Sequence, residues 1–229
     1  MKDMINIVEL VIFDMDGTIF DTEKLGIQKW MQAFKELGIS VPEQALYEKI
    51  GLNSKDSKQF LKERCGVDFD YDAVKNIKKR LTKKHISEEG TPVKNGFNEL
   101  IVFLKNKNIK TALATSRSRE NTLFYLQHAG KYFDKYFDFI VTGDMVEKGK
   151  PNPDIFLFAT SQLNISVKNS LIIEDSLNGI KAAIAAHIRV VMIPDLVLPD
   201  DEIIKSVFKV SRNLHEVIDL VTQLNNRDK

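Results

Sequence analysis

Short apolar runs alternate with helical patterns along most of this 229-residue chain, and this alternation constrains the possible folds most strongly. Residues with apolar side chains at helical spacing fill the intervals between the runs. Such alternation is typical of repeated βαβ units. We therefore predict an α/β fold with a doubly wound, mostly parallel sheet, whose strands lie at 8–13, 111–115, 139–141, 171–173 and 190–193.

Residues 22–90 depart from this alternation, because helical periodicity continues there without a convincing strand. One apolar stripe contains Trp30, Ala33, Phe34 and Leu37 and ends at Gly38. We predict an inserted all-helical domain at 22–90 and an α/β core formed by 1–21 and 91–229. Two chain crossings then connect the domains, so we expect the insertion to act as a lid over the core.

The charge balance argues against nucleic acid or a membrane as the main partner. The chain carries 33 basic and 32 acidic side chains, for a net charge of +1. Its first residues show no signal peptide or spanning segment. A single cysteine, Cys65, excludes an internal disulfide and suits a reducing compartment. We expect a cytoplasmic monomer that acts on a small molecule.

The first predicted strand leads directly into two aspartates, in the segment Asp14-Met15-Asp16-Gly17-Thr18. Ligands of open α/β sheets collect at the carboxyl ends of the strands. Two carboxylates forced together in a low dielectric repel each other unless a positive charge binds between them. This segment therefore predicts a divalent-cation site.

Three further segments place polar side chains at the same edge of the sheet. Thr115, Ser116 and Arg117 follow the second strand and can donate hydrogen bonds to anionic oxygens. Lys150, in a loop with glycine and proline, is suited to neutralising a phosphate or a developing negative charge. Glu174 and Asp175 end the fourth strand and, with Asp14 and Asp16, supply the oxygen ligands that Mg²⁺ prefers.

These motifs, in this order and across nearly the whole chain, resemble those of the haloacid dehalogenase-like hydrolase superfamily. The helical insertion resembles the cap of its β-phosphoglucomutase and sugar-phosphate phosphatase branch. The resemblance implies a Rossmann-like core and an aspartyl-phosphate mechanism. In it, Asp14 is the nucleophile and Asp16 the general acid and then base, while Thr115 and Lys150 hold the phosphoryl group.

The same resemblance implies Mg²⁺ bound by the Asp14 carboxylate, the Asp16 backbone carbonyl and Asp175, with Glu174 assisting directly or through water. Dehalogenase members lack an acid at the position of Asp16, which favours phosphoryl transfer. We predict a Mg²⁺-dependent phosphatase for a small phosphate monoester, with a sugar phosphate as the preferred class. Candidates for holding the substrate are Ser54, Lys55, Ser116, Arg117 and Arg119.

Other functions remain open at this point. Mutases of the branch carry a histidine and a cap arginine where this chain has Gly26 and Ser54. Their absence favours water over a sugar hydroxyl as the acceptor, and a phosphosugar mutase is the runner-up. Lys55 in the cap resembles the Schiff-base lysine of phosphonoacetaldehyde hydrolases, although its polar neighbours argue against that role. A non-catalytic binding protein with this fold is the last alternative.

Overall fold

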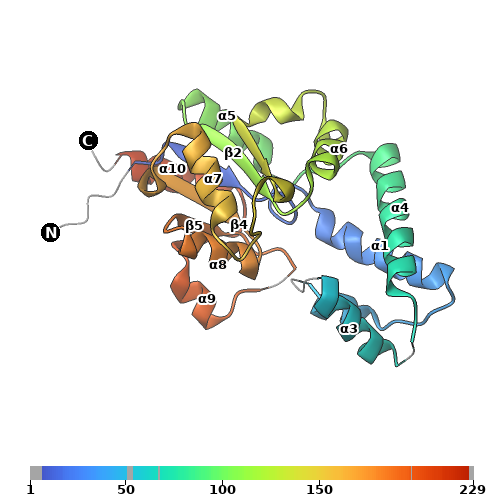
Figure 1. The fold of residues 1–229 in the computed structure, drawn as a ribbon. Coiled ribbons are helices and arrows are strands. Elements are labelled where there is room, and N and C mark those ends of the chain that lie inside the picture. Colours follow the sequence, from blue (N-terminus) through green and yellow to red (C-terminus); the bar gives the residue numbers. More distant parts are fainter. Residues whose placement is uncertain (1–6, 51–53, 67, 197, 227–229) are drawn as a thin grey trace.

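The computed structural model describes residues 7–50, 54–66, 68–196 and 198–226, and within them parallel strands form one six-stranded sheet. The strand order β3-β2-β1-β4-β5-β6 confirms the predicted doubly wound, parallel architecture (Figure 1). The strands are β1 Leu10–Phe13, β2 Lys110–Thr115, β3 Phe139–Thr142, β4 Ser170–Glu174, β5 Arg189–Met192 and β6 Lys209–Val210. The sequence missed β6 because two residues are too short to show a periodicity.

Strand β1 lies at the centre of the sheet and sets the position of the site. Its register pairs Phe13 with Leu113 of β2 on one side and with Ile173 of β4 on the other. The chain proceeds from β1 through β2 to β3 and then returns to the opposite side of β1 at β4. The strand order therefore reverses between β1 and β4, and such a switch point opens a crevice at the carboxyl ends of the two strands.

Helices cover both faces of the sheet (Figure 1). Val11 and Phe13 of β1 contribute to the core that contains residues of α5, α6 and α10, whereas Leu10 and Ile12 contribute to the core shared with α7 and α8. This alternation follows from the two-residue period of a strand. The helices are α5 Phe97–Asn106, α6 Arg119–Ala129, α7 Asp154–Leu163, α8 Leu177–Ala185, α9 Asp201–Ser206 and α10 His215–Asn226, with 3₁₀ turns η1 Phe133–Tyr136, η2 Gly143–Met145 and η3 Val167–Asn169.

The described residues within 22–90 form helices beside the sheet (Figure 1). They are α1 Thr22–Glu36, α2 Glu43–Glu48, α3 Ser54–Cys65 and α4 Tyr71–Glu89. Their apolar side chains build a separate hydrophobic cluster, in which Trp30 and Phe34 are buried as expected. Leu37 is an exception, because it lies just past the end of α1 and is 43% exposed. The short helix α2 was not predicted.

The two segments that connect these helices to the sheet lie side by side. The Asp21 amide donates to the Pro92 carbonyl at 2.9 Å, and the Lys94 amide donates to the Ile19 carbonyl at 2.7 Å. Phe20 and Val93 form an antiparallel bridge between them. The two chain connections between the helical segment and the sheet therefore form one paired junction, directly after the Asp14–Thr18 motif. No helix in the described part of the chain is both long enough and apolar enough to cross a bilayer.

Phe97 is expected to be essential for the stability of the core. Its ring is fully buried and lies 5.7 Å from the Phe13 ring and 5.3 Å from the Phe133 ring. Phe97→Ala should lower the free energy of unfolding by about 3–5 kcal/mol, because it leaves a cavity. Urea denaturation measures this change. The control Phe208→Ala, at a ring that is 46% exposed, should cost about 1 kcal/mol or less, and equal losses would contradict the assignment.

Candidate active site

The carboxyl ends of β1, β2 and β4 open into a cavity of about 620 Å³. Most of the side chains singled out in the sequence line it, because parallel neighbouring strands end at one edge of the sheet. Thr115 at the end of β2 is buried, and Ser116 after it is exposed. The predicted residues that line the cavity are Asp14, Asp16, Thr115, Ser116, Arg117, Lys150 and Asp175.

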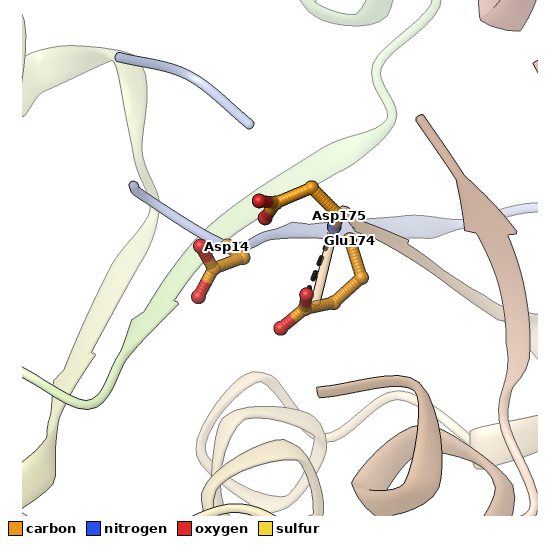
Figure 2. A group of neighbouring side chains, drawn as sticks. All are labelled: Asp14, Glu174 and Asp175. Atoms are coloured by element: carbon orange, nitrogen blue, oxygen red, sulfur yellow. Dashed lines mark hydrogen bonds between the residues drawn. The ribbon is translucent and has the colours of Figure 1, made fainter. Parts of the chain in front are cut away.

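Three carboxylates lie close together at the ends of β1 and β4 (Figure 2), and two of them, Asp14 and Asp175, line this cavity. Asp14, Glu174 and Asp175 each offer an oxygen, and these oxygens lie within 4.8 Å of one another. Burial raises the pKa of Asp14 to about 8 although Lys150 opposes the shift, and burial with the nearby Glu174 charge raises the pKa of Asp175 well above its usual range. Closely spaced oxygen donors that resist ionisation on their own fit a hard divalent cation such as Mg²⁺.

Lys150 is the positive charge that the protein itself places among these carboxylates. Its ammonium donates to Asp14 Oδ1 at 2.5 Å, to Glu174 Oε1 at 2.7 Å and to the Ala114 carbonyl at 3.1 Å. Burial lowers its pKa, but the two carboxylates outweigh that effect and hold the pKa above its usual range. Lys150 is therefore a fixed cation, and its side chain is only 4% exposed.

Glu174 uses both carboxylate oxygens on the protein itself. Besides the Lys150 bond to Oε1, its Oε2 accepts from the Asp175 amide at 2.9 Å (Figure 2). The same oxygen accepts from the Ser176 amide at 2.8 Å and from the Ser176 hydroxyl at 3.0 Å. Helix α8 approaches so closely that a Cβ on Gly179 would lie 1.6 Å from Oε1. Glu174 therefore positions Lys150 and the loop after β4, which leaves Asp14 and Asp175 better placed as direct cation ligands.

Asp175 also depends on a close backbone approach. Its Oδ1 accepts from the Thr18 hydroxyl at 3.1 Å. Gly17 has a φ of +79°, and a Cβ there would lie 2.0 Å from Asp175 Oδ2. Only glycine allows both the left-handed backbone and this contact. The glycine of the first motif thus makes room for the aspartate of the last one.

Asp16 is held apart from this group by other partners. Arg117 Nε donates to its Oδ2 at 2.6 Å, Arg117 Nη2 donates to its Oδ1 at 2.7 Å, and the Thr22 hydroxyl donates to Oδ1 at 2.5 Å. Burial by itself raises the pKa of Asp16, but Arg117 and Thr22 outweigh it and hold the pKa below its usual range. The two aspartates of the first motif are thus balanced by different cations.

Other predicted substrate-binding residues lie elsewhere. Arg119 lies outside this cavity and lines a separate hollow beside β3, where its amide donates to the Asp144 carboxylate. The sequence placed it near the site because it follows Thr115 closely, but it begins helix α6, which leads away. Ser54 and Lys55 belong to the first turn of α3, and their side chains lie outside the described residues.

The sequence also missed charged residues of the helical segment that face the site. Glu23 lines the cavity. Burial and the Arg117 charge lower the pKa of Lys78, and burial and the Lys78 charge lower the pKa of Lys49 to about 8. Lys78 is therefore half-buried near the site, although the basic run at 78–84 that contains it resembles a solvated surface in the sequence. Thr22 and Glu23 are adjacent polar residues shortly after the first motif, and this position in the sequence was the signal that could have identified them.

Comparison with known proteins assigns the family. The model of the haloacid dehalogenase-like hydrolases matches residues 11–193. A phosphorylated carbohydrates phosphatase of Thermotoga maritima is 34% identical over 184 residues, which cover 80% of this chain and 83% of the relative. Fructose-1-phosphate phosphatase YqaB of Escherichia coli is 28% identical over 178 residues, which cover 77% of this chain and 91% of the relative.

Solved structures share the fold. A candidate β-phosphoglucomutase from Thermotoga maritima superposes with a TM-score of 0.79 at 28% identity, covering 94% of this chain and 99% of that one. The β-phosphoglucomutase of Clostridium difficile has a TM-score of 0.73 at 24% identity, with coverage of 97% and 99%, and supports the fold.

The close approach of Gly179 to Glu174 can be tested by adding one methyl group. Gly179→Ala should lower the free energy of unfolding by about 1–3 kcal/mol, because the buried carboxylate must move out of its hydrogen bonds. Gly149→Ala is the control, since no atom lies within 4 Å of a Cβ at that position. Urea denaturation of both variants measures the difference, and equal stability of the two would contradict the contact.

The raised pKa of Asp14 predicts a pH dependence of stability. The pKa of Asp14 is 3.8 in an ordinary setting and about 8 in the folded protein. At a pH between these two values, the folded protein keeps a proton on Asp14 that the unfolded chain releases. The contribution of Asp14 to the free energy of unfolding therefore falls as the pH rises. In metal-free buffer, wild type should lose stability relative to Asp14→Asn between pH 5 and pH 8, by up to about 1.4 kcal/mol per pH unit. A difference that stays flat over this range would show that Asp14 is ionised throughout.

Proposed function

Because this chain belongs to the haloacid dehalogenase-like hydrolases, we propose that it is a Mg²⁺-dependent phosphatase that hydrolyses a small phosphate monoester through an aspartyl-phosphate on Asp14. The observation that carries this proposal is the position of Asp14 in the cavity. It directly follows the central strand β1, contacts the fixed ammonium of Lys150, and lies beside Asp175 and the second acid Asp16. A carboxylate nucleophile, a cation site and an acid–base group are the parts that such a reaction needs.

The substrate class is proposed as a sugar phosphate. Relatives that cover most of this chain are a phosphorylated carbohydrates phosphatase and a fructose-1-phosphate phosphatase. The cavity of about 620 Å³ is large enough for a sugar phosphate, and Thr115, Ser116 and Lys150 line it and are available to bind the phosphoryl group. Glu23 and Lys181 can receive sugar hydroxyls farther out.

In the first step, a carboxylate oxygen of Asp14 attacks phosphorus, and the bond from phosphorus to the substrate oxygen breaks. Asp16, in its protonated form, donates its proton to the leaving oxygen. Lys150 remains in contact with the Asp14 carboxylate, and its positive charge offsets the negative charge of the phosphoryl oxygens. Thr115, buried at the end of β2, is positioned to donate a hydrogen bond to the same group.

In the second step, Asp16 works as a base. It takes a proton from water, and the water oxygen attacks phosphorus. The bond between phosphorus and the Asp14 oxygen breaks, which releases phosphate and regenerates the carboxylate. Asp16 thereby recovers its proton for the next turnover.

The cation would be held by the Asp14 and Asp175 carboxylates and by the backbone carbonyl of Asp16. When bound, Mg²⁺ supplies positive charge that offsets the charge on the phosphoryl oxygens. Glu174 contributes indirectly, because its hydrogen bonds orient Lys150 and the loop that carries Asp175.

Residues 22–90 are proposed as a cap domain over a core of 1–21 and 91–229. Glu23 and Ile50 of this segment line the same cavity as Asp14, so the segment contributes to the substrate site. The paired junction between 19–21 and 92–94 is a suitable hinge for closing it. Closure would exclude water from the reacting groups and let cap residues select the substrate.

The acceptor is proposed to be water, and a phosphosugar mutase is the alternative. Gly26 lies on α1, and the Lys78 ammonium is 3.8 Å from the position of a Cβ there, so a lysine lies next to the position at which mutases carry a histidine. A protonated lysine is a poorer base for a sugar hydroxyl than a neutral imidazole. The structural similarity to β-phosphoglucomutases keeps the mutase in the experiment below.

Phosphate release from sugar phosphates, nucleotides and small monoesters, with Mg²⁺ or EDTA, tests the proposal. Wild type should release phosphate only with Mg²⁺, and Asp14→Asn should lower kcat by about 10⁴-fold or more, because it removes the nucleophile. Asp134→Asn, at a surface aspartate in contact with Lys135, should leave the rate unchanged.

Each other result has a definite meaning. Phosphate release that survives Asp14→Asn would overturn the covalent mechanism. Absence of release from every compound, together with isomerisation of glucose 1-phosphate, would establish the mutase. Absence of both activities in a folded protein would favour the binding protein.

A further inference from the structure

The ion pair between Arg117 and Asp16 conflicts with the work proposed for Asp16. The guanidinium donates to both carboxylate oxygens, at 2.6 and 2.7 Å, and the Thr22 hydroxyl donates to one of them. An acid must carry a proton on one of these oxygens, and a base must turn one of them toward water. In this arrangement both oxygens accept hydrogen bonds from protein donors instead, so neither oxygen is available for proton transfer.

Arg117 is held firmly from the side of the sheet. Its amide donates to the Thr115 hydroxyl at 3.2 Å, and its carbonyl accepts from the Gly143 amide at 2.7 Å. The guanidinium carbon lies 4.2 Å from the centre of the Tyr125 ring. A backbone fixed in this way keeps the guanidinium within reach of the cavity whichever anion it binds.

The pair remains accessible to a ligand. Both side chains line the cavity that contains Asp14, and they are 29% and 21% exposed. A guanidinium fork binds phosphate and carboxylate oxygens in the same two-pronged geometry that it uses for Asp16. An anionic group of a substrate can therefore exchange with the Asp16 carboxylate on Arg117.

We propose that Arg117 is a substrate-operated latch on Asp16. A second anionic group of the substrate, a carboxylate or phosphate separate from the phosphoryl group that is transferred, takes the guanidinium and releases Asp16 for proton transfer. This inference rests on the proposed phosphatase function. It makes Arg117 a specificity and positioning residue and names the substrate class as phosphate monoesters that carry a further anion.

A matched pair of substrates tests the latch. Glycerol 3-phosphate and 3-phosphoglycerate differ in a hydroxymethyl group that the second compound replaces with a carboxylate. For Arg117→Gln, kcat on glycerol 3-phosphate should rise, because Asp16 is no longer held. For the same variant, kcat/KM on 3-phosphoglycerate should fall by about tenfold or more, because a charged hydrogen-bonding partner is lost. A rise in kcat on glycerol 3-phosphate together with a fall in kcat/KM on 3-phosphoglycerate is the result that the latch predicts.

The control is Arg80→Gln, which removes another arginine that pairs with a carboxylate, Glu36, at the protein surface. It should change neither rate. A fall of both rates by the same factor in Arg117→Gln would show that Arg117 is merely structural. A fall with 3-phosphoglycerate alone, without a rise for glycerol 3-phosphate, would show simple substrate binding. Either result overturns the latch.

NMR of the arginine side chains gives a readout that does not depend on turnover. The Nε–H signal of Arg117, identified by its loss in Arg117→Gln, should move when 3-phosphoglycerate is added to the Asp14→Asn protein and should stay in place with glycerol 3-phosphate. No movement with either compound overturns the latch. Absence of phosphate release by wild type, with this movement present, overturns the phosphatase function and leaves the anion exchange supported.

Discussion

The contact of Lys150 with Asp14 and Glu174 is the interaction on which the rest of the site depends. Parallel strands β1 and β4 lie side by side, so the acids at their ends must meet at one edge of the sheet. Three carboxylates within 4.8 Å would repel one another strongly in a buried setting. The Lys150 ammonium, itself almost fully buried, pairs with two of these carboxylates. The pKa values of Asp14 and Asp175 stay raised, so their oxygens are the natural place for an added cation.

The strand ends were predictable from the sequence because their chemistry is local. A buried apolar run followed at once by acids identifies Asp14 and Glu174, and parallel pairing brings them together without further information. The partners of each acid were not predictable. Arg117 lies 101 residues from Asp16, and Lys150 lies 136 residues from Asp14. No periodicity specifies which cation faces which carboxylate.

Lys78 illustrates the same limit within a helix. The basic run that contains it resembles a solvated surface, and Arg80 and Lys83 indeed pair with carboxylates of exposed side chains. Lys78 instead lies next to Gly26 of α1, with its ammonium 3.8 Å from the position of a Cβ there. This neighbourhood depends on how α1 packs along α4. The strand β6 and the helix α2 escaped prediction for a simpler reason, their short length.

The two aspartates of the first motif are controlled by different parts of the molecule. Asp14 and its partner Lys150 both belong to the sheet and its loops, so their contact does not involve the helical segment. Asp16 is shared, because Arg117 follows strand β2 whereas Thr22 begins helix α1. Residues 19–21, which pair with 92–94 in the junction, lie in the sequence between Asp16 and Thr22, the first residue of α1. A movement of the helical segment at this junction would therefore shift Thr22 against Arg117 and change the hold on Asp16, while the nucleophile stays in place.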